Sequence, residues 1–263
     1  NRRDGMGKKR ADVLLFEKGL VDSREKAKTL IMEGIVFIGD SRIDKPGEKV
    51  EINAPIKIKK NPIIYVSRGG LKLEKAINCF NIQIQDKICM DIGASTGGFT
   101  DCMLKAGAKK VYAVDVGYGQ LDWTLRNDPR VIVMERTNIR YVTKDDVDDI
   151  IDFISIDVSF ISLRLVLPIA KMLLSRGGSI MALIKPQFEA GRDKVGKKGI
   201  VRSKKTHIEV IKSMVKLCKD QGLKIVDLDF SPITGGTGNI EFLTYILKSD
   251  DLVEINDTKI IET

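Results

Sequence analysis

The stretch Asp91-Ile92-Gly93-Ala94-Ser95-Thr96-Gly97-Gly98-Phe99-Thr100 decides the fold of most of this 263-residue chain. It begins at the end of the apolar run Ile88–Ile92, which is typical of a buried strand, and it opens the helix-like segment Gly98–Ala106. Glycines between a strand and a helix let the backbone turn tightly and approach a ligand without a clash from a Cβ atom. The stretch therefore predicts a ligand-binding turn at the edge of a sheet.

Beyond residue 85, strand-like and helix-like patterns alternate. The apolar runs are Ile88–Ile92, Val111–Val114, Val131–Met134, Phe153–Ile156, Ser179–Ile184, Leu223–Phe230 and Phe242–Leu247. Helical segments such as Ser162–Leu174 separate the first five runs, which predicts a doubly wound parallel α/β sheet. Residues 231–238 join the last two runs and are too few for a helical crossover, so we expect an antiparallel hairpin there. A seven-stranded sheet with such a hairpin resembles the Rossmann-like class I methyltransferases.

Two carboxylates favour S-adenosylmethionine (SAM) over a dinucleotide as the ligand of the glycine turn. Asp91, at the end of its strand, can meet the cationic amino-acid part of SAM through charge or water, whereas it would repel a pyrophosphate. Asp115 ends the next run, about 20 residues beyond the loop, where a carboxylate can accept hydrogen bonds from both ribose hydroxyls. Ser95 stands where the common pattern has a glycine, and a plain strand–helix turn without a ligand is the alternative.

The expected cofactor site has further members on the neighbouring strands. Asn138, after the third run, is assigned to the adenine end by its order along the chain alone. The full expected set is Asp91, Gly93, Ala94, Ser95, Gly97, Gly98, Phe99, Asp115, Asn138 and Asp157.

The residues after the fourth run narrow the class of methyl acceptor. The segment Ser155–Phe160 has no Pro-Pro pair, which enzymes that methylate exocyclic base nitrogens usually carry at this place. The chain also has no Pro-Cys pair, the usual setting of the nucleophile in methylation of a pyrimidine carbon. These two absences leave an oxygen atom or a simple amine as the expected acceptor of the methyl group.

Lysines and carboxylates converge on the predicted edge of the sheet. A hydroxyl needs a base, or a cation that favours its anion, to attack a methyl donor at neutral pH. Lys185 ends the fifth run beside Asp157, and we expect it to point into the ligand crevice. Lys72 can approach from the helix before the sheet, and Glu241 begins the last run. Taken singly, each lysine could equally be a solvated surface charge.

Residues 8–60 form a separate pattern of short helices and short strands. Lys9–Leu20 predicts one helix, and Ser23 predicts the N-cap of a second helix that stops at Gly34. The strand-like runs are Ile35–Ile38, Lys49–Ile52 and Ile56–Ile58. The first 60 residues carry 15 Lys and Arg against 10 Asp and Glu, so this unit is basic.

Both parts of the chain resemble known families. Arg10–Ala27, followed by Ile31–Gly39, resembles the S-four-like RNA-binding domain of ribosomal and RNA-modifying proteins. Lys72, Asp157, Lys185 and Glu241 follow the order of the Lys-Asp-Lys-Glu tetrad of FtsJ-like ribose 2′-O-methyltransferases. The strings similar to the TlyA/hemolysin A family, which joins both domains, are Ser67–Leu73, Asp91–Asp101, Lys185–Glu189 and Gly235–Glu241.

The resemblance implies a domain layout and an activity. It implies an α+β S-four-like RNA-binding domain at residues 6–62, a linker at 63–70, an FtsJ-like methyltransferase domain at 71–250 and a C-terminal tail at 251–263. The implied reaction is SAM-dependent 2′-O-methylation of cytidines in ribosomal RNA, with ribosomal subunits as partners.

Roles for the tetrad follow from the same resemblance. Lys185 would be the proton acceptor or the partner of the oxyanion, and Asp157 would hold Lys185 and face the methyl donor. Lys72 and Glu241 would orient the hydroxyl and tune the lysine.

The overall charge points to a polyanionic partner. The chain has a net charge of +8 and a pI of about 9.2, which favours nucleic acid. Residues 192–217 contain nine Lys or Arg against two Asp or Glu, in a loop followed by the amphipathic segment Lys204–Cys218. A solvated helix face is the alternative. The expected RNA contacts are Arg10, Arg24, Lys26, Lys28, Arg68, Lys197 and Lys198.

Composition argues against other classes of protein. No run approaches 18 apolar residues, and the first residues lack the apolar core of a signal peptide, so we expect a cytoplasmic protein without a membrane span. The cysteines show no CxxC or zinc spacing, which predicts free buried thiols and no metal: Cys79, Cys89, Cys102 and Cys218. A membrane-active haemolysin and a non-catalytic, RNA-binding SAM sensor are the alternative functions.

Overall fold

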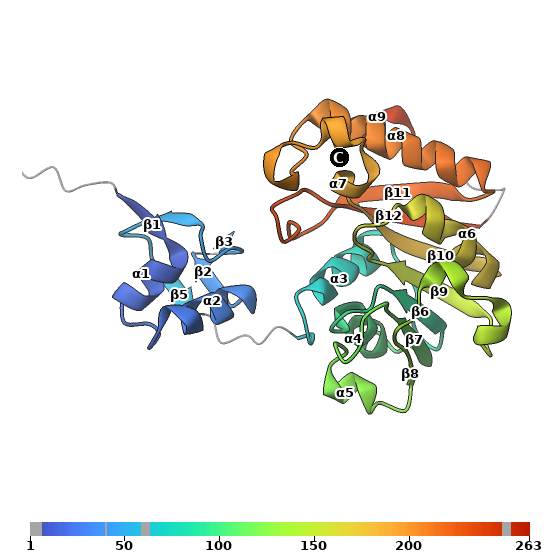
Figure 1. Ribbon diagram of the computed structural model, residues 1–263, viewed down its shortest axis with the longest axis horizontal. Coiled ribbons are helices and arrows are strands. Elements are labelled where there is room, and N and C mark those ends of the chain that lie inside the picture. The colour runs from blue at the N-terminus through green and yellow to red at the C-terminus, as the bar shows by residue number, and fades with distance from the viewer. Residues whose placement is uncertain (1–6, 40, 59–63, 249–253) are drawn as a thin grey trace, which may run out of the picture. The chain divides into compact units, whose positions relative to one another are not determined.

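The computed structural model describes residues 7–39, 41–58, 64–248 and 254–263, which divide into two compact units at Arg68 and Gly69 (Figure 1). Residues 6, 40, 59–63 and 249–253, which fall within the expected domains, linker and tail, lie outside the described residues. Each unit has a hydrophobic core of its own, so each is described by itself.

The first unit packs two helices against short strands. Its helices are α1 (Ala11–Glu17) and α2 (Arg24–Met32), and its strands are β1 (Lys8–Arg10), β2 (Val36–Ile38), β3 (Ser41–Arg42), β4 (Lys49–Glu51) and β5 (Ile56–Ile58). β2 lies between β3 and β5, and β1 pairs with β4, all antiparallel. The core residues include Leu14, Leu15, Ile31 and Val36.

The second helix of this unit begins and ends as predicted. The Ser23 hydroxyl accepts a hydrogen bond from the Lys26 amide at 3.1 Å, and Gly34 stops the helix with a φ angle of +74°. The first helix was predicted too long, because Lys9 and Arg10 pair with β4 as part of β1. This strand is set by a partner some 40 residues away, which local sequence does not reveal.

The second unit contains the predicted seven-stranded sheet. Its strands are β6 (Ile88–Ile92), β7 (Lys110–Val114), β8 (Val131–Met134), β9 (Ile151–Ile156), β10 (Leu174–Ile184), β11 (Lys224–Phe230) and β12 (Phe242–Leu247). They lie in the order β11-β12-β10-β9-β6-β7-β8. Only β12 is antiparallel to its neighbours, β10 and β11, so the predicted terminal hairpin is confirmed.

Helices cover both faces of this sheet. The α-helices are α3 (Gly69–Cys79), α4 (Gly98–Lys105), α5 (Trp123–Arg126), α6 (Leu163–Leu173), α7 (Pro186–Glu189), α8 (Lys204–Asp220) and α9 (Asp257–Glu262). The short 3₁₀ turns are η1 (Ile139–Tyr141), η2 (Lys144–Asp146), η3 (Arg192–Lys194) and η4 (Lys197–Gly199). Met90 and Ile92 belong to one core with residues of α6 and α8, whereas Asp91 bonds to Thr100 of α4. Alternate strand residues therefore face opposite helical layers.

Three local features differ from the sequence expectations. The last two residues of the expected linker, Gly69 and Gly70, already belong to α3. The segment expected as a tail contains α9, whose Ile260 is buried in the core shared with α8. The structure describes all four cysteines and none of them forms a disulfide, but Cys79 is exposed as the last residue of α3, so the prediction of burial was wrong for this cysteine.

Candidate cofactor and active site

The glycine turn packs against the backbone that follows β9. Gly93 and Gly97 have φ angles of +85° and +104°, a region that favours glycine. A Cβ atom on Gly93 would lie 2.0 Å from the carbonyl oxygen of Asp157, so only glycine fits there. Ser95, at the position where the sequence departs from the common pattern, also has a positive φ of 51°. The turn thus brings the ends of β6 and β9 together.

Asp115 anchors this turn from the end of β7. Its carboxylate accepts hydrogen bonds from the Ser95 amide at 2.8 Å and from the Gly117 amide at 2.7 Å, one on each oxygen. A carboxylate oxygen can accept more than one hydrogen bond, so both oxygens keep capacity for a ligand. The Asp115 carboxylate is therefore fixed in place and can still accept hydrogen bonds from a ligand.

A pocket opens beside Asp115 at the ends of β6, β7 and β8. Its lining residues are Ala94, Ser95, Ala113, Asp115, Gly117, Gln120, Leu121, Val133 and Glu135. Asn138, expected at the adenine end, is not in this lining; it caps η1 by accepting from the Arg140 amide at 3.1 Å. Glu135 and Gln120 were missed by the sequence reasoning, although Glu135 directly follows a predicted strand.

Asp91 is completely buried rather than exposed to a ligand. Its oxygens accept from the Thr100 hydroxyl at 2.7 Å and the Ser155 hydroxyl at 3.3 Å, which ties β6 to α4 and β9. Burial raises the pKa of Asp91 to about 7, partly offset by these hydrogen bonds. Direct contact with a cofactor would require these neighbours to move. Phe99, in the first turn of α4, is also buried.

Lys185 and Asp157 form one ion pair at the edge of the sheet. The Lys185 Nζ lies 2.5 Å from an Asp157 carboxylate oxygen and donates to the Ser159 hydroxyl at 3.1 Å. Lys185 is buried, although it follows β10 at the end where ligands usually bind. Ser159 was missed by the sequence reasoning, which had no basis for choosing it.

Lys72 and Glu241 form a second, buried ion pair. The Lys72 Nζ donates to a Glu241 carboxylate oxygen at 2.7 Å. A Cβ atom on Gly235 would lie 2.5 Å from the other Glu241 oxygen, so this glycine lets the loop close over the carboxylate. Ile184 of β10 pairs with Phe242 of β12 in antiparallel register. Lys185 and Glu241 are the next residues beyond this pair, so they lie side by side where the two strands end.

The two ion pairs and the glycine turn occupy one edge of the sheet. Asp157 links the glycine turn to the first of these pairs, because its backbone lies against Gly93 and its carboxylate contacts Lys185. Charged side chains this well buried are retained where their charges are paired. The arrangement offers a fixed ammonium group beside a turn that can receive a ligand, which suits stabilisation of a developing negative charge.

An exposed aromatic residue borders this edge and was not predicted. Phe160 is 91% exposed, has a φ angle of +64° and lies two residues before the N-cap of α6. Its ring centroid is 5.1 Å from that of Phe188 in α7. Large side chains rarely adopt a positive φ, and such strain is often kept at functional sites.

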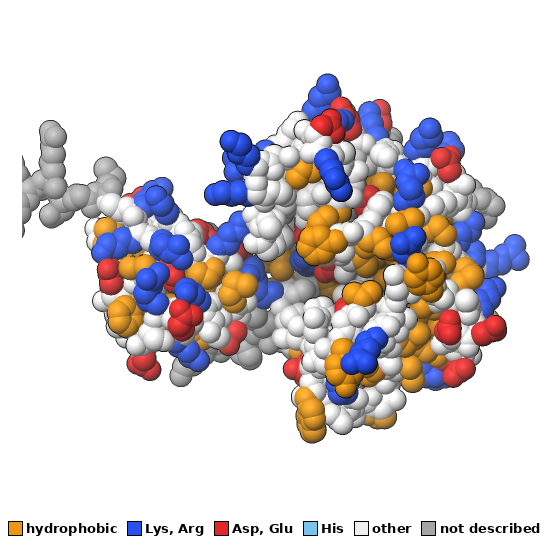
Figure 2. Space-filling view, in the orientation of Figure 1, with side chains coloured by type: hydrophobic (Ala, Val, Ile, Leu, Met, Phe, Trp, Pro, Cys, Tyr) orange, Lys and Arg blue, Asp and Glu red, His pale blue; other side chains and the backbone are white. Residues whose placement is uncertain are grey.

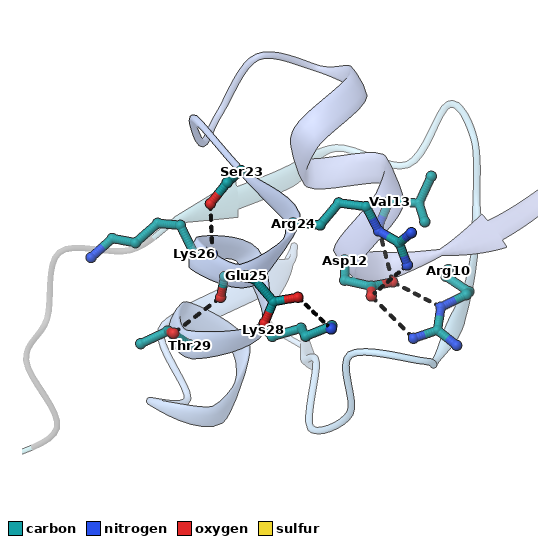
Figure 3. A network of polar contacts seen from close by, with 9 residues as sticks. All are labelled: Arg10, Asp12, Val13, Ser23, Arg24, Glu25, Lys26, Lys28 and Thr29. Carbon is teal, nitrogen blue, oxygen red and sulfur yellow. Dashed lines mark hydrogen bonds and ion pairs between the residues drawn. The ribbon is translucent and has the colours of Figure 1, made fainter.

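The expected RNA contacts differ in how available they are. Arg10 and Arg24 share the buried Asp12, and Lys28 pairs with Glu25, whereas Lys26 is exposed (Figure 3). The Arg68 side chain is only 16% exposed and pairs with Asp44 at 2.7 Å, so little of it faces solvent. Lys197 and Lys198 are exposed in η4. Figure 2 shows basic side chains on both units over the face that is drawn.

Two kinds of feature are absent from the part of the chain that the structure describes. No helix in these ranges is long and apolar enough to cross a membrane. The same ranges hold no group of three or more His, Cys, Asp or Glu residues that could bind a metal ion.

Comparisons with known proteins match both units. The profile of FtsJ-like methyltransferases matches residues 65–248, and that of the S4 domain matches residues 9–56. A Bacillus subtilis protein named "Putative rRNA methyltransferase YqxC" is 59% identical over 91% of this chain and 85% of its own length. The 16S/23S rRNA (cytidine-2'-O)-methyltransferase TlyA of Mycobacterium tuberculosis is 40% identical over 92% of this chain and 91% of its own.

A solved structure matches nearly the full length of the chain. The one named "Putative hemolysin from Streptococcus thermophilus" superposes with a TM-score of 0.76 at 50% identity. The match covers 98% of this chain and 94% of the other.

Proposed function

The chain belongs to the TlyA/hemolysin A family of FtsJ-like methyltransferases with an S4 domain, and on this premise we propose that it methylates the ribose 2′-hydroxyl of cytidines in ribosomal RNA. In this proposal residues 6–62 bind RNA, residues 71–250 carry out the transfer and the protein works in the cytoplasm. The observation that carries it is the ion pair of Lys185 and Asp157 directly against the glycine turn.

The residues at the strand ends fit SAM as the methyl donor. Gly93 lets the turn pack closely against the Asp157 backbone, and Asp115 is held by two amides with capacity left for ribose hydroxyls. Glu135 and Gln120, which line the pocket beside Asp115, would lie next to the nucleoside end. When bound, SAM supplies an electrophilic methyl group on a sulfonium centre.

The chain's own residues would then activate the ribose hydroxyl. Lys185, held by its ion pair with Asp157, would stabilise negative charge that develops on the attacking oxygen. Asp157 and Ser159 fix the direction of the Lys185 side chain. Lys72 and Glu241, held together at 2.7 Å, would position the hydroxyl from the other side.

Transfer of a labelled methyl group tests the proposal. Purified ribosomal subunits from cells that lack this protein are incubated with it and tritiated SAM, and nuclease mapping with mass spectrometry locates the label. We expect 2′-O-methylcytidine with the wild type, and loss of turnover by at least about 100-fold with Lys185→Ala while SAM binding stays nearly intact.

A matched control separates the site from a general loss of charge. Lys109, an exposed lysine before β7, lies at the opposite ends of the strands, so Lys109→Ala should keep full turnover. Full turnover by Lys185→Ala would contradict the assigned role. Lysis of red cells by the protein without SAM, and no label in RNA, would favour a membrane-active function instead.

A further inference from the structure

Asp12 is a buried acid in the unit expected to bind RNA. It lies in the first turn of α1 and is 0% exposed. One carboxylate oxygen accepts from Arg10 Nε at 2.9 Å and the Val13 amide at 3.0 Å, and the other accepts from Arg10 Nη2 at 3.0 Å and Arg24 Nη2 at 3.3 Å (Figure 3). The Asp12 carboxylate is therefore fully occupied by the protein itself.

The two arginines bound to this acid remain at the surface. The side chains of Arg10 and Arg24 are 49% and 51% exposed, while that of Asp12 is covered. A polyanion that approaches this cluster meets two guanidinium groups and no carboxylate. The cluster thus displays positive charge and hides its single negative charge.

A second Arg-Asp-Arg cluster in the same unit provides the contrast. Asp44 accepts from Arg42 at 2.9 Å and from Arg68 at 2.7 Å. There the arginine side chains are only 18% and 16% exposed, and the acid is 30% exposed. The arginine side chains of that cluster are largely buried, as in a group that stabilises the fold. Pairing with an acid therefore does not by itself leave arginines at the surface.

The exposed guanidinium groups keep hydrogen-bond donors for a ligand. A guanidinium has five N–H donors, of which the contacts to Asp12 use two in Arg10 and one in Arg24. No other hydrogen bond from either side chain is found to the residues that the structure describes. Because both are already held, binding a phosphate orders them further at little entropic cost, and the planar fork suits phosphate oxygens.

We infer that Asp12 is a positioning residue for RNA, which holds Arg10 and Arg24 as a pre-set pair of guanidinium groups for backbone phosphates. This inference rests on the proposed function. It adds to the RNA-binding site a residue, Asp12, whose negative charge has the same sign as that of RNA. General electrostatics predicts that removing a negative charge strengthens RNA binding. A positioning role for Asp12 predicts that removing its charge weakens RNA binding. The direction of the change in RNA affinity therefore distinguishes the two explanations.

The test compares two substitutions that each remove one negative charge from the same unit. Asp12→Asn frees the arginines, whereas Glu25→Gln, on the neighbouring α2, breaks only the exposed pair with Lys28. In the full chain with purified ribosomal subunits, we expect Asp12→Asn to raise the Kd and the KM for subunits about tenfold. Its kcat at saturation and its Kd for SAM should stay unchanged, and Glu25→Gln should leave RNA binding equal or tighter.

A second pair of variants covers the case in which Asp12→Asn unfolds the first unit, which thermal unfolding would reveal. Arg10→Lys and Arg24→Lys keep Asp12 and every charge but lose the planar fork, and each should raise the KM for subunits severalfold. The inference is overturned if folded Asp12→Asn binds subunits as tightly as Glu25→Gln, or if the lysine variants keep wild-type KM. If the wild type neither binds nor methylates subunits, the proposed function fails instead.

Discussion

Phe160 joins an unusual backbone to an exposed ring beside the proposed active site. It is 91% exposed, its φ angle is +64°, and it directly follows Ser159, which contacts Lys185. Exposed aromatic rings stack on unpaired bases, and such stacking contributes about 1–3 kcal/mol for each base. The strain and the exposure together point to a contact with the target nucleotide.

We expect Phe160→Gly to separate stability from turnover. Glycine accepts the positive φ, so the free energy of unfolding in urea should stay level or rise by up to about 1 kcal/mol. Loss of stacking should raise the KM for ribosomal subunits about tenfold. Phe160→Tyr keeps the ring and should keep the KM, and an unchanged KM for the glycine variant would exclude the stacking role.

The buried Asp91 makes stability depend on pH in a defined direction. Burial raises its pKa in the folded chain to about 7, from 3.8 when unfolded. Between these values the folded chain holds a proton that the unfolded chain has lost. The stability contributed by the neutral carboxyl is therefore complete below about pH 4 and is lost as the pH rises through about 7.

Asp91→Asn, which cannot ionise, should remove this dependence. Relative to the wild type without cofactor, its free energy of unfolding should rise between about pH 5 and pH 7 by up to about 1.4 kcal/mol for each pH unit. Urea unfolding at several pH values measures the difference. A difference that is constant over the whole range would contradict the raised pKa.

Sequence could predict which residue types stand at the strand ends but not how deeply each is buried. The position of Asp115 after a strand was enough to place it beside a pocket, as the structure has it. Asp91 is the last residue but one of β6, yet its carboxylate faces α4 and accepts a hydrogen bond from Thr100. Which helix covers a given face of the sheet depends on tertiary packing, and no local pattern reveals it.

Two loops at the active edge are joined by one buried amide. Asn239 is 1% exposed; its oxygen accepts from the Val201 amide and its nitrogen donates to the Gly199 carbonyl, each at 2.9 Å. The first loop carries the exposed Lys197 and Lys198, and the second leads into Glu241. Asn239 therefore holds the basic loop next to the segment that positions a proposed catalytic residue.

We expect Asn239→Ala to release this basic loop. Two backbone groups lose their partner, which costs on the order of 1–3 kcal/mol of local stability. Trypsin should then cleave after Lys197 or Lys198 about tenfold faster or more, and kcat should fall because Glu241 is less well held. Asn127→Ala, at an exposed helix end, is the control; equal cleavage rates in the two variants would contradict the role of Asn239.

Elements with a strong apolar pattern were predictable, and those set by distant partners were not. Ile88–Ile92, Val131–Met134 and Phe242–Leu247 are strands with the predicted bounds. β1 consists of Lys8–Arg10, three basic residues whose extended form depends on β4. The amphipathic segment Lys204–Cys218 lies in helix α8 as predicted, but its apolar residues Ile208 and Val215 are only half-buried, because neighbouring elements cover the face one residue further round.

In the proposed function the first unit binds RNA and the second unit transfers the methyl group. The core of the first unit is built from residues 11–58 alone, and the main core of the second from residues 88–260. Separate cores allow separate folding. The first 60 residues carry 15 basic against 10 acidic side chains, so they hold much of the net charge of +8. The glycine turn and both buried ion pairs belong to the second unit.

A fragment that begins at Tyr65 should therefore keep the cofactor site and lose RNA affinity. It retains the whole range that matches the FtsJ-like profile, so we expect a Kd for SAM within about twofold of the full chain. The KM for ribosomal subunits should rise by at least about tenfold, because the Arg10 and Arg24 pair is gone. The dependence of binding on salt should also become shallower, since fewer phosphates are neutralised. A fragment that methylates subunits with the KM and salt dependence of the full chain would show that the first unit does not bind the substrate.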